Sequence, residues 1–166
     1  MFELKKLSPD ALDAARQKAA QYRLLNHPFL AESICRDILA VKPDDQETLV
    51  MLCLALCDQF GVEGGATVPT AMEVAQQFRG EYERTYYAGI VYERMAFSRL
   101  RRGGRAAGQV AYDWFMKAME RFEVAAEIRP AGNDDAILRW NTCARVVNLR
   151  SSVHAGHETT GPLMLE

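Results

Sequence analysis

The sequence contains no apolar run approaching the roughly 18 residues that a membrane-spanning helix requires. Its first residues, MFELKKLSPD, include two lysines but no apolar stretch behind them, so we expect no secretory signal peptide. Cysteine is scarce as well: four residues stand at positions 35, 53, 57 and 143, and none forms a C-x-x-C pair. Cysteines spaced in this way, in a chain with no expected signal peptide, are typical of the cytoplasm, where disulfides are rare. We therefore expect buried, reduced thiols and a cytoplasmic protein.

Patterns typical of catalytic and cofactor sites are also missing. The sequence has no nucleotide-binding loop, no nucleophile elbow and no zinc-protease helix. Cys53 and Cys57 lie one helical turn apart, but no cysteine or histidine partner follows at zinc spacing. His154 and His157 alone provide too few ligands for a metal site. We therefore expect no enzymatic activity, no metal and no cofactor.

Neither sign of charge is in large excess, because 20 basic and 22 acidic residues leave a net charge of −2. Such a balance gives no general attraction to nucleic acid or to an anionic membrane. The exception is a basic run that contains Arg94, Arg99, Arg101, Arg102 and Arg105 and no acidic residue. Arginines of this run are candidates for binding an anion or nucleic acid. The simpler interpretation is a solvated helix end whose cations face the negative end of the helix dipole.

Hydrophobic periodicity typical of helices covers most of the chain, with 49% apolar and 25% charged residues. Proline, glycine and capping residues divide it into about seven predicted helices. Their approximate ranges are 9–25, 29–41, 46–60, 70–79, 81–102, 111–129 and 134–149. We expect one helical domain over residues 8–149. Periodicity ends after Leu149, which predicts a mobile tail over residues 150–166.

Two stretches of the chain share an ordered spacing of small, large and turn residues. In residues 111–147 the series is Ala118, Phe122, Ala125 and Pro130, and the same steps separate Ala31, Cys35, Ile38 and Pro43. Tyr22 and the small Ala19 precede the second series, and Gly89 and Tyr92 repeat that pair. A glycine inside a helix usually marks a close approach to a neighbouring helix.

This spacing resembles the tetratricopeptide repeat family, whose helix-turn-helix unit has 34 residues. Residues 12–45 match one whole unit, and 111–147 match the end of another unit and a closing helix. The middle of the chain matches less well: the loop at 61–69 is enlarged and the 98–110 segment is an insertion, in either a loop or a helix. The resemblance implies an all-α fold of antiparallel helix hairpins stacked into a right-handed α-solenoid. A generic helical bundle is the alternative, but it gives no reason for the repeated spacing.

The resemblance also implies a concave groove that binds a peptide or helix of a partner protein. The projected lining is Arg16, Arg23, Val50, Leu54, Tyr86, Ile90, Glu93, Leu138 and Arg145. An apolar centre with arginines towards both ends suits a peptide or amphipathic helix with acidic flanks. The alternative is that Val50, Leu54 and Ile90 pack against neighbouring helices. The Lys and Asn that clamp chaperone tails in some repeats are not found at the corresponding positions.

The sequence therefore predicts a non-enzymatic protein–protein interaction module, a scaffold or adaptor whose partner it does not identify. One alternative is a self-associating structural protein, in which Leu163, Met164 and Leu165 of the tail fill the groove of a neighbour. Another is a nucleic-acid or anion binder acting through the Arg94–Arg105 run, with Arg99, Arg101, Arg102 and Arg105 as contacts.

Overall fold

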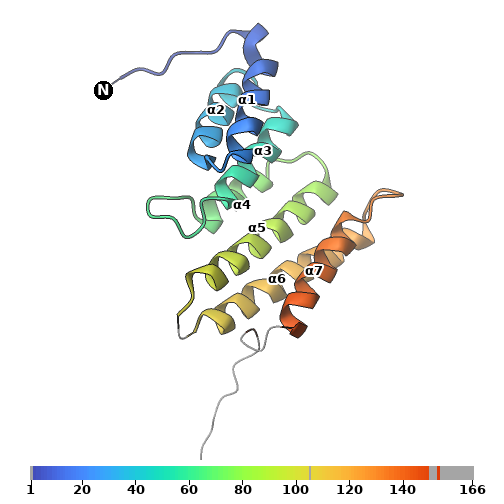
Figure 1. Ribbon diagram of the computed structural model, residues 1–166. Helices are drawn as coiled ribbons and strands as arrows, with labels where there is room; N and C mark the ends of the chain where they lie inside the picture. The colour runs from blue at the N-terminus through green and yellow to red at the C-terminus, as the bar shows by residue number, and fades with distance from the viewer. Residues whose placement is uncertain (1, 105, 150–152, 154–166) are drawn as a thin grey trace, which may run out of the picture.

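The structure, a computed structural model, describes residues 2–104, 106–149 and 153. Over these residues the fold is all-α, with seven α-helices and no strand (Figure 1). The helices are α1 Leu12–Leu24, α2 Pro28–Val41, α3 Gln46–Cys57, α4 Val68–Ala75, α5 Glu81–Arg102, α6 Ala107–Glu127 and α7 Asp135–Leu149. A short 3-10 turn at Pro9–Ala11 precedes α1. The predicted fold class and number of helices are confirmed for the described part of the chain.

Each helix packs on the next along the chain, and the first helices of successive hairpins also touch, α1 against α3 and α3 against α5. Figure 1 shows the hairpins following one another from α1 and α2 at one end to α6 and α7 at the other. This packing of neighbours is consistent with a helical repeat. No helix in the described residues is both long enough and apolar enough to cross a bilayer.

The insertion at 98–110 lengthens helices. α5 has 22 residues and α6 has 21, whereas α3 has 12 and α4 has 8. The two long helices approach closely at Gly89, where a Cβ atom would stand 2.5 Å from a ring carbon of Phe122. The close helix approach predicted for this glycine is confirmed.

Two large hydrophobic clusters form most of the core. The first is built mainly from α1 to α4 around Leu49, Leu52 and Phe60, and the second joins α5, α6 and α7 around Phe115 and Phe122. Tyr87 and Trp114 pack against both clusters. The residues of the repeated spacing, Ala31, Cys35, Ile38, Ala118, Phe122 and Ala125, are all fully buried. The spacing therefore marks packing positions.

All four cysteines are free and buried, as predicted. Burial raises the pKa of the Cys35 and Cys143 thiols to about 12 in each case. In the described part of the chain no group of three or more cysteine, histidine or acidic side chains is placed to hold a metal ion.

Several predicted boundaries are corrected. α4 begins at Val68, before the predicted residue 70, and the Thr67 hydroxyl accepts a hydrogen bond from the Thr70 amide. α6 begins at Ala107, before the predicted residue 111. Just before α7, Asn133 Oδ1 accepts a hydrogen bond from the Asp135 amide at 3.0 Å.

The predicted tail contains one residue that the structure describes, Val153. It is 1% exposed and packs in the second cluster, so the core extends beyond the predicted domain limit at residue 149. The rest of the range 150–166, with Leu163, Met164 and Leu165, lies outside the described residues.

Candidate partner-binding site

The predicted groove is interrupted where α7 covers α5. Ile90 and Glu93 are each 1% exposed, so neither lines an open surface, and this part of the prediction is wrong. Ile90 belongs to the second hydrophobic cluster. Glu93 forms an ion pair with Arg139 of α7, with 3.2 Å between Arg139 Nη1 and Glu93 Oε2. The Cys143 thiol donates a weak hydrogen bond to the same carboxylate at 3.9 Å.

The apolar centre of the predicted groove is shared between surface and core. Val50 is half-buried against the first cluster, and Leu54 and Tyr86 are half-buried against the second. The Tyr86 ring stacks on that of Tyr82 with 5.6 Å between centroids and also meets the rings of Tyr87 and Phe122. On α7, Leu138 and Arg145 are exposed. Tyr86 therefore packs in part against other side chains, as the alternative interpretation proposed for Val50, Leu54 and Ile90.

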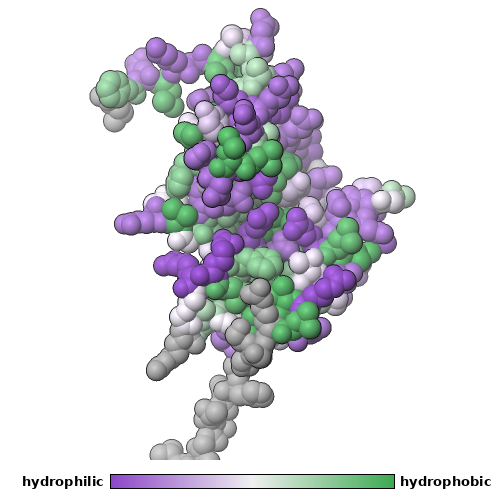
Figure 2. Space-filling view, in the orientation of Figure 1, coloured by the Kyte–Doolittle hydropathy of each residue, from purple (hydrophilic) through white to green (hydrophobic). Residues whose placement is uncertain are grey.

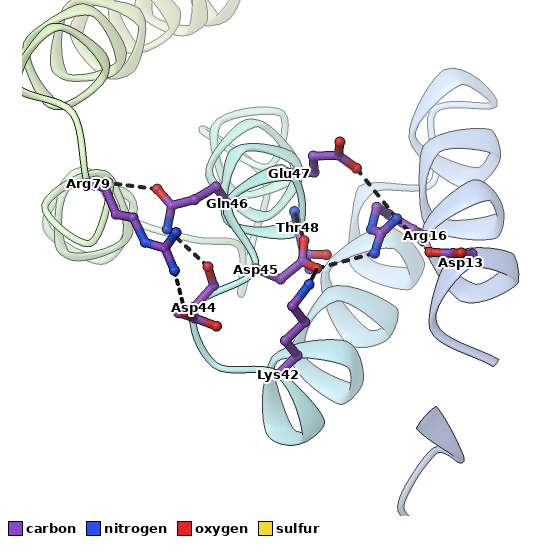
Figure 3. Close-up of polar contacts among 9 residues, drawn as sticks. All are labelled: Asp13, Arg16, Lys42, Asp44, Asp45, Gln46, Glu47, Thr48 and Arg79. Carbon is purple, nitrogen blue, oxygen red and sulfur yellow. Dashed lines mark hydrogen bonds and ion pairs between the residues drawn. The ribbon is translucent and has the colours of Figure 1, made fainter. Parts of the chain in front are cut away.

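Arg16, predicted at one end of the groove, belongs to a polar cluster at the start of α3 (Figure 3). Asp45 caps α3 by accepting a hydrogen bond from the Thr48 amide at 3.0 Å. Its other carboxylate oxygen lies 3.2 Å from both Arg16 and Lys42. Burial alone would raise the pKa of Asp45, but the hydrogen bonds from Thr48 and Lys42 and the charge of Arg16 hold it below its usual value.

The same cluster extends to the connection between α4 and α5. Arg79 forms an ion pair with Asp44, and its amide donates a hydrogen bond to the Gln46 side chain at 2.9 Å. Arg16 also contacts Asp13 and Glu47. Each of these two arginines is paired with carboxylates of its own chain. The cluster joins α1, the start of α3 and the connection between α4 and α5, and Arg16 is not free to bind an acidic partner.

An open cleft of about 650 Å³ lies at the other end of α1 and α3. We call it the arginine cleft. It is bounded by the α1–α2 turn, the end of α3 and its following loop, and the last turns of α5. Its lining includes Phe29, Leu30, Asp58, Val62, Arg94, Ser98, Arg101 and Arg102.

The floor of the arginine cleft exists because α5 is long enough to pass beneath the loop that follows α3. Ser98 is 2% exposed, and its hydroxyl donates a hydrogen bond to the Phe60 carbonyl at 2.7 Å. Gly61 follows with a φ of +85°, and a Cβ there would stand 2.6 Å from Ser98 Oγ. The buried Gln59 side chain further fixes the loop by donating to Glu32 and accepting from the Ala66 amide. The loop is therefore held in place before any ligand arrives.

One wall of the arginine cleft is apolar. Phe29 and Leu30 follow the left-handed Asn26 and begin α2, and they are 46% and 49% exposed. Val62 of the loop after α3 is 51% exposed. Three large apolar side chains therefore remain about half in water around this cleft.

The other wall carries cations. Asp58 is flanked by Arg23, at 2.8 Å, and by Arg94, at 3.5 Å. Arg101 and Arg102 also line the cleft and are exposed, and the ion pairs among the described residues include neither of them. Arg99 lies beside Gly103 and Gly104 in a separate hollow of about 280 Å³. Arg105 lies outside the described residues.

The structure thus brings two predicted anion-binding residues, Arg101 and Arg102, into the lining of the cleft, and one predicted groove residue, Arg23, pairs with Asp58 of that lining. Sequence reasoning missed the apolar wall and Ser98. The enlarged loop at 61–69 was the available signal, since a long glycine-rich loop beside a long helix indicates an irregular surface.

Comparison with protein-family models, curated proteins and solved structures finds no match to this chain. The resemblance to tetratricopeptide repeats therefore stays a prediction from residue spacing.

Proposed function

We propose that the protein is a non-enzymatic interaction module of the cytoplasm, a tetratricopeptide-like scaffold or adaptor that binds a peptide or helix of a partner. The observation that carries the proposal is the arginine cleft, in which half-exposed Phe29, Leu30 and Val62 face the same hollow as Arg101 and Arg102. Aromatic and arginine side chains are enriched at the buried core of protein interfaces relative to the rest of the surface. The cleft volume of about 650 Å³ lies within the range of roughly 300–1,000 Å³ found for ligand-binding pockets.

The rigidity of the arginine cleft also supports the proposal. Its floor is fixed by the Ser98–Phe60 hydrogen bond, and its walls rise from helix ends and a short turn. A preorganised surface avoids the entropy cost of ordering its own side chains and loops during binding. The partner segment then bears most of the ordering cost.

A photo-crosslinking experiment tests the proposal. A photoreactive phenylalanine analogue replaces Val62 in one variant and Val124 in another, because Val124 on α6 is similarly exposed at 42% but lies outside the cleft. We expect extracts of the native host to give a discrete crosslinked partner from position 62 alone. The partner is then purified, and Leu30→Glu should weaken its binding, measured by calorimetry, about tenfold or more, as for a buried apolar contact.

The control is Val124→Glu, which should leave the dissociation constant unchanged. Equal crosslinking at both positions, or a purified partner whose affinity ignores Leu30→Glu, would contradict the proposed site. Circular dichroism establishes that both variants are folded before either is scored.

Self-association is the second candidate function, favoured by the surface of α7. Leu138 and Leu149 are 61% and 81% exposed, and Figure 2 shows hydrophobic atoms gathered over this helix. A structural protein that associates through α7 should sediment as a larger species at higher concentration, and Leu138→Glu should return it to a monomer. Sedimentation as a monomer at every concentration excludes this candidate.

A further inference from the structure

We propose that the arginine cleft selects an acidic peptide segment in which carboxylates stand next to an apolar side chain. This inference rests on the proposed function, since it names the class of partner that the same site takes. It assigns the two halves of the site to two halves of the ligand: Arg101 and Arg102 bind the carboxylates, and Phe29, Leu30 and Val62 cover the apolar group.

The excess positive charge of the cleft favours an acidic ligand. Asp58 is the acidic residue in the lining, and Arg23 and Arg94 already neutralise it. Arg101 and Arg102 are left as a local excess of positive charge on a chain whose net charge is −2. Guanidinium groups bind carboxylates through paired, charge-assisted hydrogen bonds, which gives these two residues a preference for acidic ligands.

Packing of the Arg102 side chain also favours anion binding. Its Cδ atom would stand 3.1 Å from a Cβ placed on Gly61, so the aliphatic part of Arg102 lies against the loop that Ser98 holds. An arginine whose stem is packed loses less freedom when its head group binds an anion. The stem of Arg102 thus lies against the loop at the edge of the cleft.

The apolar wall decides between a peptide and a nucleic acid. A nucleic-acid site needs a series of cations spaced along many phosphates, and here two neighbouring arginines line one open cleft of about 650 Å³. Phe29 offers one aromatic ring, whereas Leu30 and Val62 are aliphatic and favour an aliphatic or aromatic peptide side chain. A bare phosphate would leave all three in water.

The test is selection from a randomised peptide display library by the whole chain. We expect the enriched peptides to share aspartate or glutamate beside a large apolar residue. The double variant R101Q/R102Q should lose this enrichment, while R121Q should keep it, because Arg121 is an exposed arginine of α6 outside the cleft. Fluorescence anisotropy then compares a selected peptide with its glutamine analogue, which should bind about tenfold more weakly for the loss of charge-assisted hydrogen bonds.

The other possible outcomes contradict different parts of the proposal. Enrichment of apolar peptides without acidic residues, unaffected by R101Q/R102Q, overturns this inference and leaves the proposed peptide-binding function standing. Failure of the wild-type chain to enrich any peptide overturns both. Displacement of the selected peptide by a single-stranded DNA oligonucleotide, with tighter binding of the DNA, overturns the assignment to peptide and favours the nucleic-acid alternative.

Discussion

The fold shifts the pKa values of two buried carboxylates, Asp45 and Glu93, in opposite directions. Asp45 is 5% exposed and receives hydrogen bonds and cations that lower its pKa. Glu93 is 1% exposed, and burial raises its pKa although the charges of Arg139 and Arg94 oppose the shift. The two residues should therefore contribute to stability with opposite dependence on pH.

For Asp45, the folded state holds the proton less tightly than the unfolded chain, so its contribution is full above the unfolded pKa and lost as pH falls through the folded pKa. Asp45→Ala removes the cap of α3 and should cost about 1 kcal/mol at neutral pH. Urea unfolding of both proteins across the acid range measures the difference. It should shrink below about pH 4, where the unfolded aspartate is protonated. A difference that stays constant with pH would show that the charge of Asp45 plays no part.

For Glu93, the folded state holds the proton more tightly than the unfolded chain. Its contribution should therefore fall as pH rises from the ordinary glutamate value of 4.5 through the raised folded pKa. Glu93→Gln keeps the shape and an acceptor for Arg139 but removes this titration. The free energy of unfolding of the wild type should decline relative to that of the variant across this window. Parallel pH profiles would mean that the Glu93 pKa is not raised.

At the scale of the element, the pair α5 and α6 depends on Gly89. Gly89→Ala places a methyl group against the Phe122 ring, and overpacking of this kind costs about 1–3 kcal/mol. Phe122→Leu removes the ring carbons that the methyl group would meet, so the double variant should lose less stability than the sum of the two single variants. Thermal or urea unfolding of the four proteins measures this coupling. Strict additivity would mean that α5 and α6 do not meet at this point.

Helix identity and number were predictable from the sequence, because periodic apolar residues, the proline that begins α2 and the Asn133 cap before α7 are local signals. The start of α4 was not, since Thr67 and Thr70 both head a plausible cap and the choice depends on where the loop after α3 ends. The length of α6 was also missed, because Gly108 near its start indicates a loop when read alone.

The candidate site was predictable only in its charges. Arg101 and Arg102 stand out as part of a basic run, whereas nothing local distinguishes Leu30 from the buried Ile38 of the same helix. Exposure of Phe29, Leu30 and Val62 depends on which helices cover the start of α2 and the loop after α3, which is a tertiary property. For the same reason the sequence placed Glu93 on a surface that α7 covers.

For the whole molecule, the division of the core predicts two cooperative units. The first cluster belongs mainly to α1–α4 and the second to α5–α7, and Tyr87 and Trp114 join them. In repeat architectures stability is the sum of the units and the interfaces between neighbours. Native-state hydrogen exchange should show amides of α1 and α2 opening at a lower free energy than those of α5 and α6. Identical opening energies for all these helices would mean a single cooperative unit.

The arginine cleft crosses that division, because Phe29 and Leu30 belong to the first unit and Arg101 and Arg102 to the second. A ligand held by both walls would be released whenever α2 opens locally, so its residence time is limited by the weaker unit. By linkage, occupancy should in turn slow that opening, and amides of α2 should gain protection far beyond the contact points. Because α5 is long enough to reach the cleft, ligand binding there is linked to the local opening of α2.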